Sequence, residues 1–464
     1  MVGARAFTLR KARLVALRSA RPRDVHPVRW WIRRTPWLLP VLSVLLGVAL
    51  GVLLVRPPGS IASVLRGVAW QASSHEARTM LSTVLGIAIS SLSIVLSLSM
   101  LVIQNAAGQY SPRLLRLFLH GAGIRVVIPV FVATSVFCLV AAQLFGFDSG
   151  DERLPRPALS MAMLLLVLCE AALVFQVLDT IQLMRVENLV RQVGRNTLRV
   201  ARALERRRQE DVVPAAVRSP SSESFPLRAR EDGFVVDVDG AALLRVAEER
   251  GLVVHVDVAI GEPVMRGGVV GWVEPGRLGP PESHEVSEQL AHALLVDRWR
   301  EQDADVALGV RQLVDVAIKA LSPAINDPYT AVEVLDQLTF LLCGLCQLHL
   351  GPRALADASG RPRVFLRAPS LRDYLELATD QILRYGASEP AVVLRLLRLA
   401  GAVGQRAQGE EDRHAARQTL HRILAAAERA QTDSPQLEPL RRHAEAMERA
   451  LDGEGLPSIP AIAF

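Results

Sequence analysis

The stretch MLSTVLGIAISSLSIVLSLSMLVI, residues 80–103, decides the fold of the N-terminal part of the chain, because it contains no charged side chain. An α-helix rises about 1.5 Å per residue, so a run of this length can cross a hydrocarbon layer about 30 Å thick. Three further apolar runs accompany it, and the four predicted spans are residues 37–55, 80–103, 126–147 and 158–181. The sequence therefore predicts a membrane protein that crosses the bilayer four times.

The orientation of these spans follows from the basic residues around them. Ten Lys and Arg residues precede the first span against one acid, and arginines are also frequent after the second and fourth spans. Because short arginine-rich segments stay on the cytoplasmic side, both termini are predicted to be cytoplasmic in a bacterial inner (plasma) membrane. Trp30, Trp31 and Trp37 are placed to anchor the inner interface, and a lipid bilayer with anionic headgroups is the expected surrounding.

The composition argues against a nucleic-acid partner. Lys11 and Lys319 are the only lysines among 53 Lys and Arg residues, which is typical of a GC-rich bacterial genome rather than of phosphate recognition. The juxtamembrane segments also explain most of the positive net charge. No nucleic-acid partner is therefore expected.

The predicted fold class is a mostly α membrane protein with four transmembrane helices and a cytoplasmic α+β tail, in which a small β module precedes a helical bundle. Composition divides the chain into five segments. These are a basic cytoplasmic N-terminal segment (1–36), the transmembrane domain (37–183), a basic helix with a Pro/Ser-rich linker (184–227), a small β-rich module (228–277) and a cytoplasmic helical domain (284–464).

The β-rich module shows alternating and helical patterns in turn. FVVDV (234–238) alternates, GAALLRVAEER (240–250) has helical periodicity, and LVVHVDV (252–258) alternates again before a Gly-Gly turn and a last strand. The run resembles half of a barrel-sandwich motif of the lipoyl or biotinyl type. Carrier domains need a lysine to modify, and none lies between Lys11 and Lys319, so a structural or docking module is expected.

The chain after Ser287 is predicted to be nearly all helical. A periodicity of 3.6 residues recurs between turns. The six predicted helices are residues 305–321, 328–348, 371–386, 390–405, 412–430 and 435–451.

One face of the second span carries small or polar side chains along its length. Its members are Ser82, Gly86, Ser90, Ser93, Ser97 and Gln104. Small residues and hydroxyl groups allow close packing of membrane helices, which is the first interpretation. The functional hypothesis is that this face lines a hydrated pathway, where water satisfies polar groups at membrane depth.

The fourth span contains two acids, Glu170 near its middle and Asp179 toward its inner end. An acid at the bilayer centre costs roughly 2.5 to 3.5 kcal/mol on insertion scales, so Glu170 is expected to face protein or water, or to be protonated. With Gln176 the two acids could form an ion or proton relay. A structural hydrogen bond from Glu170 to serines of the second span is the alternative, and Asp179 is close enough to the interface to reach it.

The stretch ALSPAINDPYTAVEVLDQL predicts a rigid corner between two helices. Ser322 and Pro323 end the first helix, and Asp327 is placed to cap the second, which Pro328 opens. The turn would display Asn326 and Asp327. A structural corner is the first interpretation, and a cytoplasmic binding loop with Ser322, Asn326 and Asp327 is the second.

Two other patterns have a structural and a functional interpretation. Arg191, Arg195 and Arg199 fall on one face of the helix after the fourth span, which could follow lipid headgroups, contact neighbouring helices or be solvated. Cys343 and Cys346 form a C-x-x-C, a spacing that can hold a metal or a redox pair, and His349 follows three residues later. No second cysteine pair accompanies them, so buried core residues are the first interpretation. No catalytic motif, cofactor site or metal site is found, and an enzyme is not expected.

The segments LSTVLGIAISSLSIVLSLSMLVIQNAAGQYSPRLLRLFL and ALGVRQLVDVAIKALSPAINDPYTAVEVLDQL resemble signature segments of the domain-of-unknown-function 2254 family of predicted bacterial membrane proteins. With the four spans and the β-rich module, the resemblance extends over most of the chain from about Trp37. It implies the architecture and the membrane location, and it implies no biochemical activity. Members often carry a histidine pair late in span four, which VFQVLDTIQ lacks.

The leading functional hypothesis is a homo-oligomeric channel-like or transport protein with a cytoplasmic regulatory tail. Four spans with one polar face enclose little room in a monomer, so several copies would share a pathway. The alternative is a non-transporting membrane scaffold or sensor that binds a cytoplasmic protein partner. A membrane-embedded enzyme is third, because Glu170 lacks a second catalytic group.

Overall fold

The computed structural model describes residues 38–55, 69–109, 122–147, 154–183, 185–208, 212–214, 223–275, 283–301, 303–431 and 434–458. The chain forms two compact units, Met1–Arg185 and Val186–Phe464. The basic N-terminal segment with its three tryptophans and much of the Pro/Ser-rich linker lie outside the described residues.

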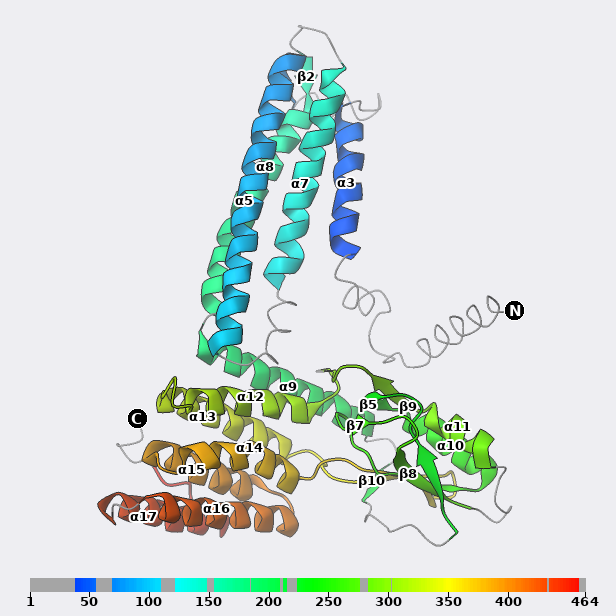
Figure 1. Ribbon diagram of the computed structural model, residues 1–464, viewed down its shortest axis with the longest axis vertical. Coiled ribbons are helices and arrows are strands. Elements are labelled where there is room, and N and C mark those ends of the chain that lie inside the picture. The colour runs from blue at the N-terminus through cyan, green and yellow to red at the C-terminus, as the bar shows by residue number, and fades with distance from the viewer. Residues whose placement is uncertain are drawn as a thin grey trace. The chain divides into compact units, whose positions relative to one another are not determined.

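Four long helices make up the described part of the first unit (Figure 1). They are α3 (Leu38–Val55), α5 (Ser74–Gln109), α7 (Ala122–Gly146) and α8 (Pro157–Leu183). Each contains a stretch that is long and apolar enough to cross a membrane. The four predicted spans are thus confirmed as candidate membrane helices, although α5 begins at Ser74, before the predicted start.

Helix α7 holds the first unit together, since α3, α5 and α8 all pack against it. On α3 the buried face is made of small residues, with Ser43, Gly47 and Gly51 spaced four apart. A Cβ atom at Gly47 would lie 2.7 Å from the carbonyl oxygen of Ala133 in α7, so the approach depends on glycine. This is the small-residue packing that is common between membrane helices, and it was not predicted from the sequence.

Two short strands of the first unit pair with each other, one just before α5 and the other just before α8. Strand β1 (Trp70–Ala72) pairs antiparallel with β2 (Leu154–Arg156). The buried Arg156 donates hydrogen bonds to the Ala72 carbonyl and to Ser74 Oγ, and its guanidinium lies over the ring of Phe145. These contacts fix the start of α5 against the start of α8.

The helices of the second unit stack in layers (Figure 1). Helix α9 (Val186–Arg208) covers α12 (Val306–Ala320) and α13 (Pro328–Leu345), which are followed by α14 (Leu371–Gly386) with α15 (Pro390–Arg406) and by α16 (Glu410–Ala430) with α17 (Ser434–Leu451). All six helices predicted in this region are present, because each presents an aliphatic stripe to its neighbours.

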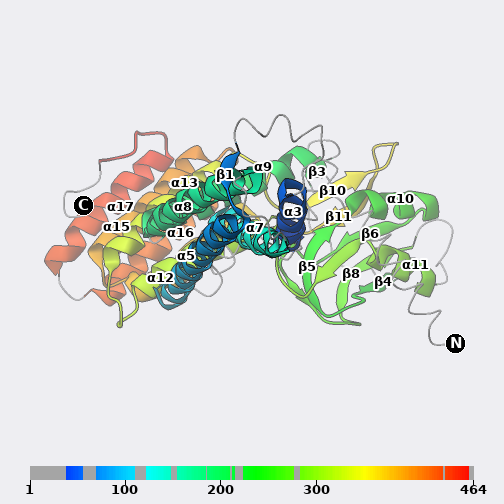
Figure 2. The same cartoon turned by 90° about the horizontal axis from the view of Figure 1, so that it is seen from above.

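A six-stranded mixed sheet forms the other part of the second unit (Figure 2). Its order is β3 (Val212–Pro214), β10 (Arg353–Ala356), β11 (Pro362–Leu366), β6 (Val253–Val256), β8 (Val269–Glu274) and β4 (Phe225–Arg228). A smaller sheet has the order β7 (Pro263–Val264), β5 (Gly233–Val238) and β9 (Leu294–Asp297). Helices α10 (Gly240–Arg250) and α11 (Ser283–Ala291) pack on the larger sheet.

Two expectations about this region need correction. The barrel-sandwich arrangement is not confirmed, because β5 pairs with β7 and β9, whereas β6 and β8 belong to the larger sheet. The expectation that the chain is nearly all helical after Ser287 needs correction at β9, β10 and β11, which are strands. Strand β11 lies parallel to β6, with Phe365 opposite His255, so the sheet takes strands from far beyond residue 277.

Candidate functional site

The predicted polar face of α5 lies on the surface of the first unit. The residues of this face are all exposed: Ser82, Gly86, Ser90, Ser93, Ser97 and Gln104. A Cβ atom placed on Gly86 would meet no other atom within 4 Å, so the surface there is open. Ser93 Oγ donates a 3.0 Å hydrogen bond to the carbonyl of Ile89, which satisfies the hydroxyl hydrogen within its own helix. The face therefore remains available to groups outside the chain.

The opposite face of α5 makes its contacts with α7 and α8. The buried residues of that face are Leu81, Val84, Ala88, Ser91, Val95 and Ser99. Successive residues of an α-helix are rotated by about 100°, which places these positions on the side away from the polar face. Among the described residues of the first unit, the polar face is therefore not the face that packs α5 against other helices.

The acids of the fourth span do not come together in the structure. Glu170 is exposed on α8 between exposed Val167 and Val174, whereas Asp179 is half-buried. Nine residues of helix place the two carboxyl groups on opposite faces. Gln176 is buried and donates to Thr180 Oγ1 at 3.4 Å. In the described part of the chain, no hydrogen bond joins Glu170 to a serine of α5, and no relay along one face of α8 is formed.

Helix α9 presents the predicted arginine face to its surroundings. Its exposed arginines are Arg191, Arg195, Arg199, Arg202 and Arg206. The other face is fixed against α12 and α13, where Thr197 fits over Gly309 and Leu198 over Gly344. Arg199 donates to Asn196 Oδ1 at 2.9 Å, and among the described residues none of the five forms an ion pair. The five arginines of α9 thus form a row of positive charge that no described carboxylate neutralises.

The predicted corner joins α12 to α13. Asp327 caps α13 by accepting hydrogen bonds from the backbone N–H and the hydroxyl of Thr330, at 3.1 and 2.6 Å. Ser322 Oγ donates to the carbonyl of Lys319 at 2.7 Å, and the Asn326 N–H donates to the Ser322 carbonyl. Asn326 has φ of 48°, the left-handed region, and its side chain is exposed. Ser322 and Asp327 thus build the corner, and Asn326 is displayed with exposed Ile325 and Tyr329.

The second span and this corner are the segments that carried the family resemblance. Residues 33–401 match the family model described as "Predicted membrane protein (DUF2254)". The chain belongs to this family. In this DUF2254 protein the matched residues include the four candidate membrane helices, both sheets and the α12–α13 corner, and they end within α15.

Mycobacterial proteins of this kind are similar to the chain over most of its length. "Uncharacterized protein Mb1321c" of Mycobacterium bovis is 30% identical over 414 residues, which cover 87% of this chain and 78% of the relative. "Uncharacterized protein Rv1290c" of Mycobacterium tuberculosis has the same identity and coverage. No solved structure matches the chain.

The cysteine pair of this DUF2254 protein lies at the end of α13. Burial raises the pKa of both the Cys343 and the Cys346 thiols, and Arg406 Nη1, 3.5 Å from Cys343 Sγ, offsets only part of this. A raised pKa disfavours the thiolate, the form that binds metals. His349 instead pairs with buried Glu205 of α9, with Nδ1 2.6 Å from Oε1. Among the described residues no group of His, Cys, Asp and Glu side chains is arranged to hold a metal ion.

A partly buried charged cluster in the helical layers was not predicted from the sequence. Arg395 and Arg398 of α15 lie beside Asp336 of α13, with Arg395 Nη1 3.6 Å from Asp336 Oδ1. His443 of α17 is buried next to them, and burial together with the two arginines lowers its pKa to about 4. The members come from three helices that are far apart in sequence, so only the fold brings them together.

Proposed function

We propose that this DUF2254 protein is a homo-oligomeric channel-like or transport protein of the bacterial inner membrane, with both termini and the second unit in the cytoplasm. The observation that supports it is the polar face of α5, which is exposed opposite the packing face of the same helix. One helix face cannot enclose a pathway, so several copies would contribute it. The proposal includes no catalysis, metal or cofactor.

The energetics of exposed polar groups favour an assembly. In a single copy the hydroxyls of the polar face of α5 and the carboxyl of Glu170 would face hydrocarbon. An acid at the bilayer centre costs roughly 2.5 to 3.5 kcal/mol, and part of this cost disappears when a second copy or water covers the group. Ser90, Ser93, Ser97 and Gln104 would then line the pathway, and Glu170 would set its charge preference.

The arginines of α9 support a cytoplasmic second unit next to anionic lipid. Helix α9 begins three residues after α8 ends at Leu183. Only two residues separate the two helices in the sequence, so the arginines of α9 directly follow the last candidate membrane helix along the chain. Each basic residue near an anionic surface contributes about 1 kcal/mol, and five of them are exposed on this helix.

The test is the ionic current across a planar bilayer that contains the purified full-length protein. Discrete currents are expected from the wild type, and Ser97→Leu should reduce or abolish them because leucine fills the polar face. Ile94→Phe is the control, since Ile94 is exposed on α5 outside that face, and it should leave the currents unchanged. Equal currents from wild type and Ser97→Leu would contradict the proposed pathway, and silence from folded and inserted protein would contradict an ion channel.

A membrane scaffold or sensor is the second candidate, and the α12–α13 corner favours it. Ile325 and Tyr329 are large apolar side chains that stand exposed on either side of the left-handed Asn326. A rigid turn that displays such residues is suited to binding a cytoplasmic protein partner.

This second candidate makes different predictions. The full-length protein would be electrically silent, and Ser97→Leu would leave it folded and functional. A cytoplasmic protein would be retained by the full chain, but not by the Tyr329→Ala variant or by a chain that ends at Arg208. If the full-length protein gives currents and the Tyr329→Ala variant retains the cytoplasmic protein as the wild type does, the scaffold is excluded.

A further inference from the structure

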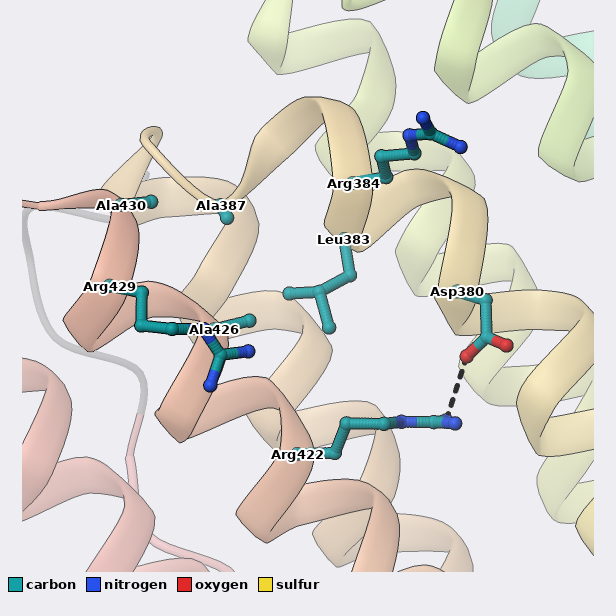
Figure 3. Close-up of a pocket in the computed structure, with 8 residues that line it drawn as sticks. All are labelled: Asp380, Leu383, Arg384, Ala387, Arg422, Ala426, Arg429 and Ala430. Atoms are coloured by element: carbon teal, nitrogen blue, oxygen red, sulfur yellow. Dashed lines mark ion pairs between the residues drawn. The ribbon is translucent and has the colours of Figure 1, made fainter.

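A hollow of about 480 Å³ lies between the C-terminal halves of α14 and α16, where Figure 3 shows three arginines around its rim. Its lining residues are Asp380, Leu383, Arg384, Ala387, Arg422, Ala426, Arg429 and Ala430. The volume is within the range of small-molecule sites, which combine apolar lining residues with a few polar or charged groups. Arg422, Arg429 and the end of α16 lie beyond residue 401, where the family match ends, whereas the lining residues of α14 lie within the match.

Small side chains create the hollow. Ala387 follows the end of α14, and Ala426 and Ala430 face it from α16, so no long side chain fills the space between the helices. Leu383 provides an apolar wall. Gln431 Nε2 donates to the Ala387 carbonyl, which ties the end of α16 to the end of α14 and keeps the two helices at this spacing.

Arg422 is held in place at one side of the hollow. Its Nη2 lies 2.9 Å from Asp380 Oδ1 and donates to Thr379 Oγ1 at 3.2 Å. Thr379 is fully buried, so the guanidinium is anchored between two groups of α14. Its Nε is buried and has no hydrogen-bond partner among the described residues. An arginine that is already ordered loses little freedom when it binds an anion.

The other two arginines of the hollow are available to a ligand. Arg384 and Arg429 are exposed, and in the described ranges neither has an ion pair or hydrogen bond. In Figure 3 the guanidinium of Arg429 turns toward the centre of the hollow, and Arg384 stands at its rim. Three arginines against one aspartate leave two positive charges at the hollow.

We propose that this hollow binds a phosphate monoester, with Arg429 and Arg422 contacting the phosphate and the alanines and Leu383 contacting the organic part. A phosphate monoester carries about −1.5 to −2 charge at pH 7, which matches the two uncompensated positive charges. Guanidinium groups form paired hydrogen bonds with phosphate oxygens, and Arg384 can close over the ligand. The site lies outside the candidate membrane helices, and it stands whether or not the protein conducts ions.

The competing explanation is that Arg384 and Arg429 only stabilise helix ends. Both are in the last turn of their helices, where a cation interacts favourably with the C-terminal carbonyl groups. This explanation predicts that their removal lowers the melting temperature equally with and without phosphate. Phosphate binding predicts a difference that appears only when phosphate is present.

The experiment titrates the full-length protein in nanodiscs of neutral lipid with inorganic phosphate and with glycerol 3-phosphate, against chloride at equal ionic strength. Isothermal calorimetry and thermal unfolding measure binding. Arg429→Gln and Arg422→Gln are each expected to weaken binding about tenfold or more. Arg417→Gln on the far face of α16, where Arg417 pairs with Asp452, is the matched control and should bind as the wild type does.

A second arm distinguishes a soluble ligand from a lipid headgroup. Nanodiscs containing phosphatidic acid replace the soluble phosphates, and a binding gain that Arg429→Gln removes would assign the same site to a lipid phosphate. Because Arg429 is exposed, its variant is expected to fold normally and tests the site even if Arg422→Gln unfolds. Absence of binding in both arms, or binding that Arg429→Gln leaves unchanged, would overturn the proposal.

Discussion

At the scale of single residues, two glycines of one helix interface have opposite roles. A Cβ atom at Gly309 in α12 would overlap Thr197 of α9, with Thr197 Cβ only 2.8 Å away, whereas one at Gly194 in α9 would meet nothing closer than Gln337 Oε1 at 4.0 Å. Gly309→Ala should therefore destabilise the second unit by about 1–3 kcal/mol through overpacking. Gly194→Ala should stabilise it by up to about 1 kcal/mol through helix propensity. Denaturant unfolding of both variants checks this, and equal effects would contradict it.

His443 makes stability depend on pH. Its pKa is lowered to about 4 by burial and by Arg398 and Arg395, below the ordinary value of 6.5. Between pH 6.5 and pH 4 the imidazole therefore binds a proton in the unfolded chain but not in the folded chain. The contribution of His443 to the free energy of unfolding is complete above pH 6.5 and is lost as the pH falls toward 4. The loss amounts to about 3 kcal/mol at most.

The check compares the free energy of unfolding of wild type and His443→Gln from about pH 7 to pH 4.5. The variant should lose less stability on acidification, whatever its stability at neutral pH. His421→Gln is the control, because His421 is an exposed side chain that pairs with Glu448. Parallel pH profiles of wild type and His443→Gln would show that the buried imidazole does not titrate in this way.

At the scale of elements, α9 is a helix with one fixed face and one charged face. Anionic lipid in nanodiscs is expected to raise the melting temperature of the full-length protein. A triple variant with Arg195→Gln, Arg199→Gln and Arg202→Gln should gain less, because three headgroup contacts are lost. A matched triple variant on α17, Arg441→Gln with Arg442→Gln and Arg449→Gln, removes the same charge from another helix. If both triple variants respond alike, α9 has no special role in lipid contact.

At the scale of the whole molecule, the proposed homo-oligomer requires the polar face of α5, and not its packing face, to meet another copy. Ser97 is exposed and Ser91 is buried against the neighbouring helices of the same chain. Ser97→Cys should therefore cross-link two copies in native membranes, whereas Ser91→Cys should not. Gel mobility and mass photometry of the purified protein report the products. A monomeric Ser97→Cys protein without cross-links would argue against the homo-oligomer.

Local sequence was sufficient for much of the fold. The candidate membrane helices follow from uncharged runs long enough to cross a bilayer. Asp327 and Pro328 mark the start of α13 because a capping side chain and a fixed φ act within one turn. Helix α10 was likewise predicted at its observed bounds, from Gly240 to Arg250. Each of these features depends on residues within a few positions of one another, so it could be predicted from the sequence.

Tertiary structure decided the rest. Strand β11 pairs with β6 across more than a hundred residues, and no local pattern specifies that partner. The polar pattern of α5 was visible in the sequence, but its outward direction depends on which face α7 and α8 cover. The arginine hollow and the His443 cluster combine side chains of separate helices. Composition and periodicity thus determined which segments are helices and which can cross a membrane, since these follow from local transfer energies and torsions. Which faces remain exposed was decided only by packing, because burial depends on residues that are distant in sequence.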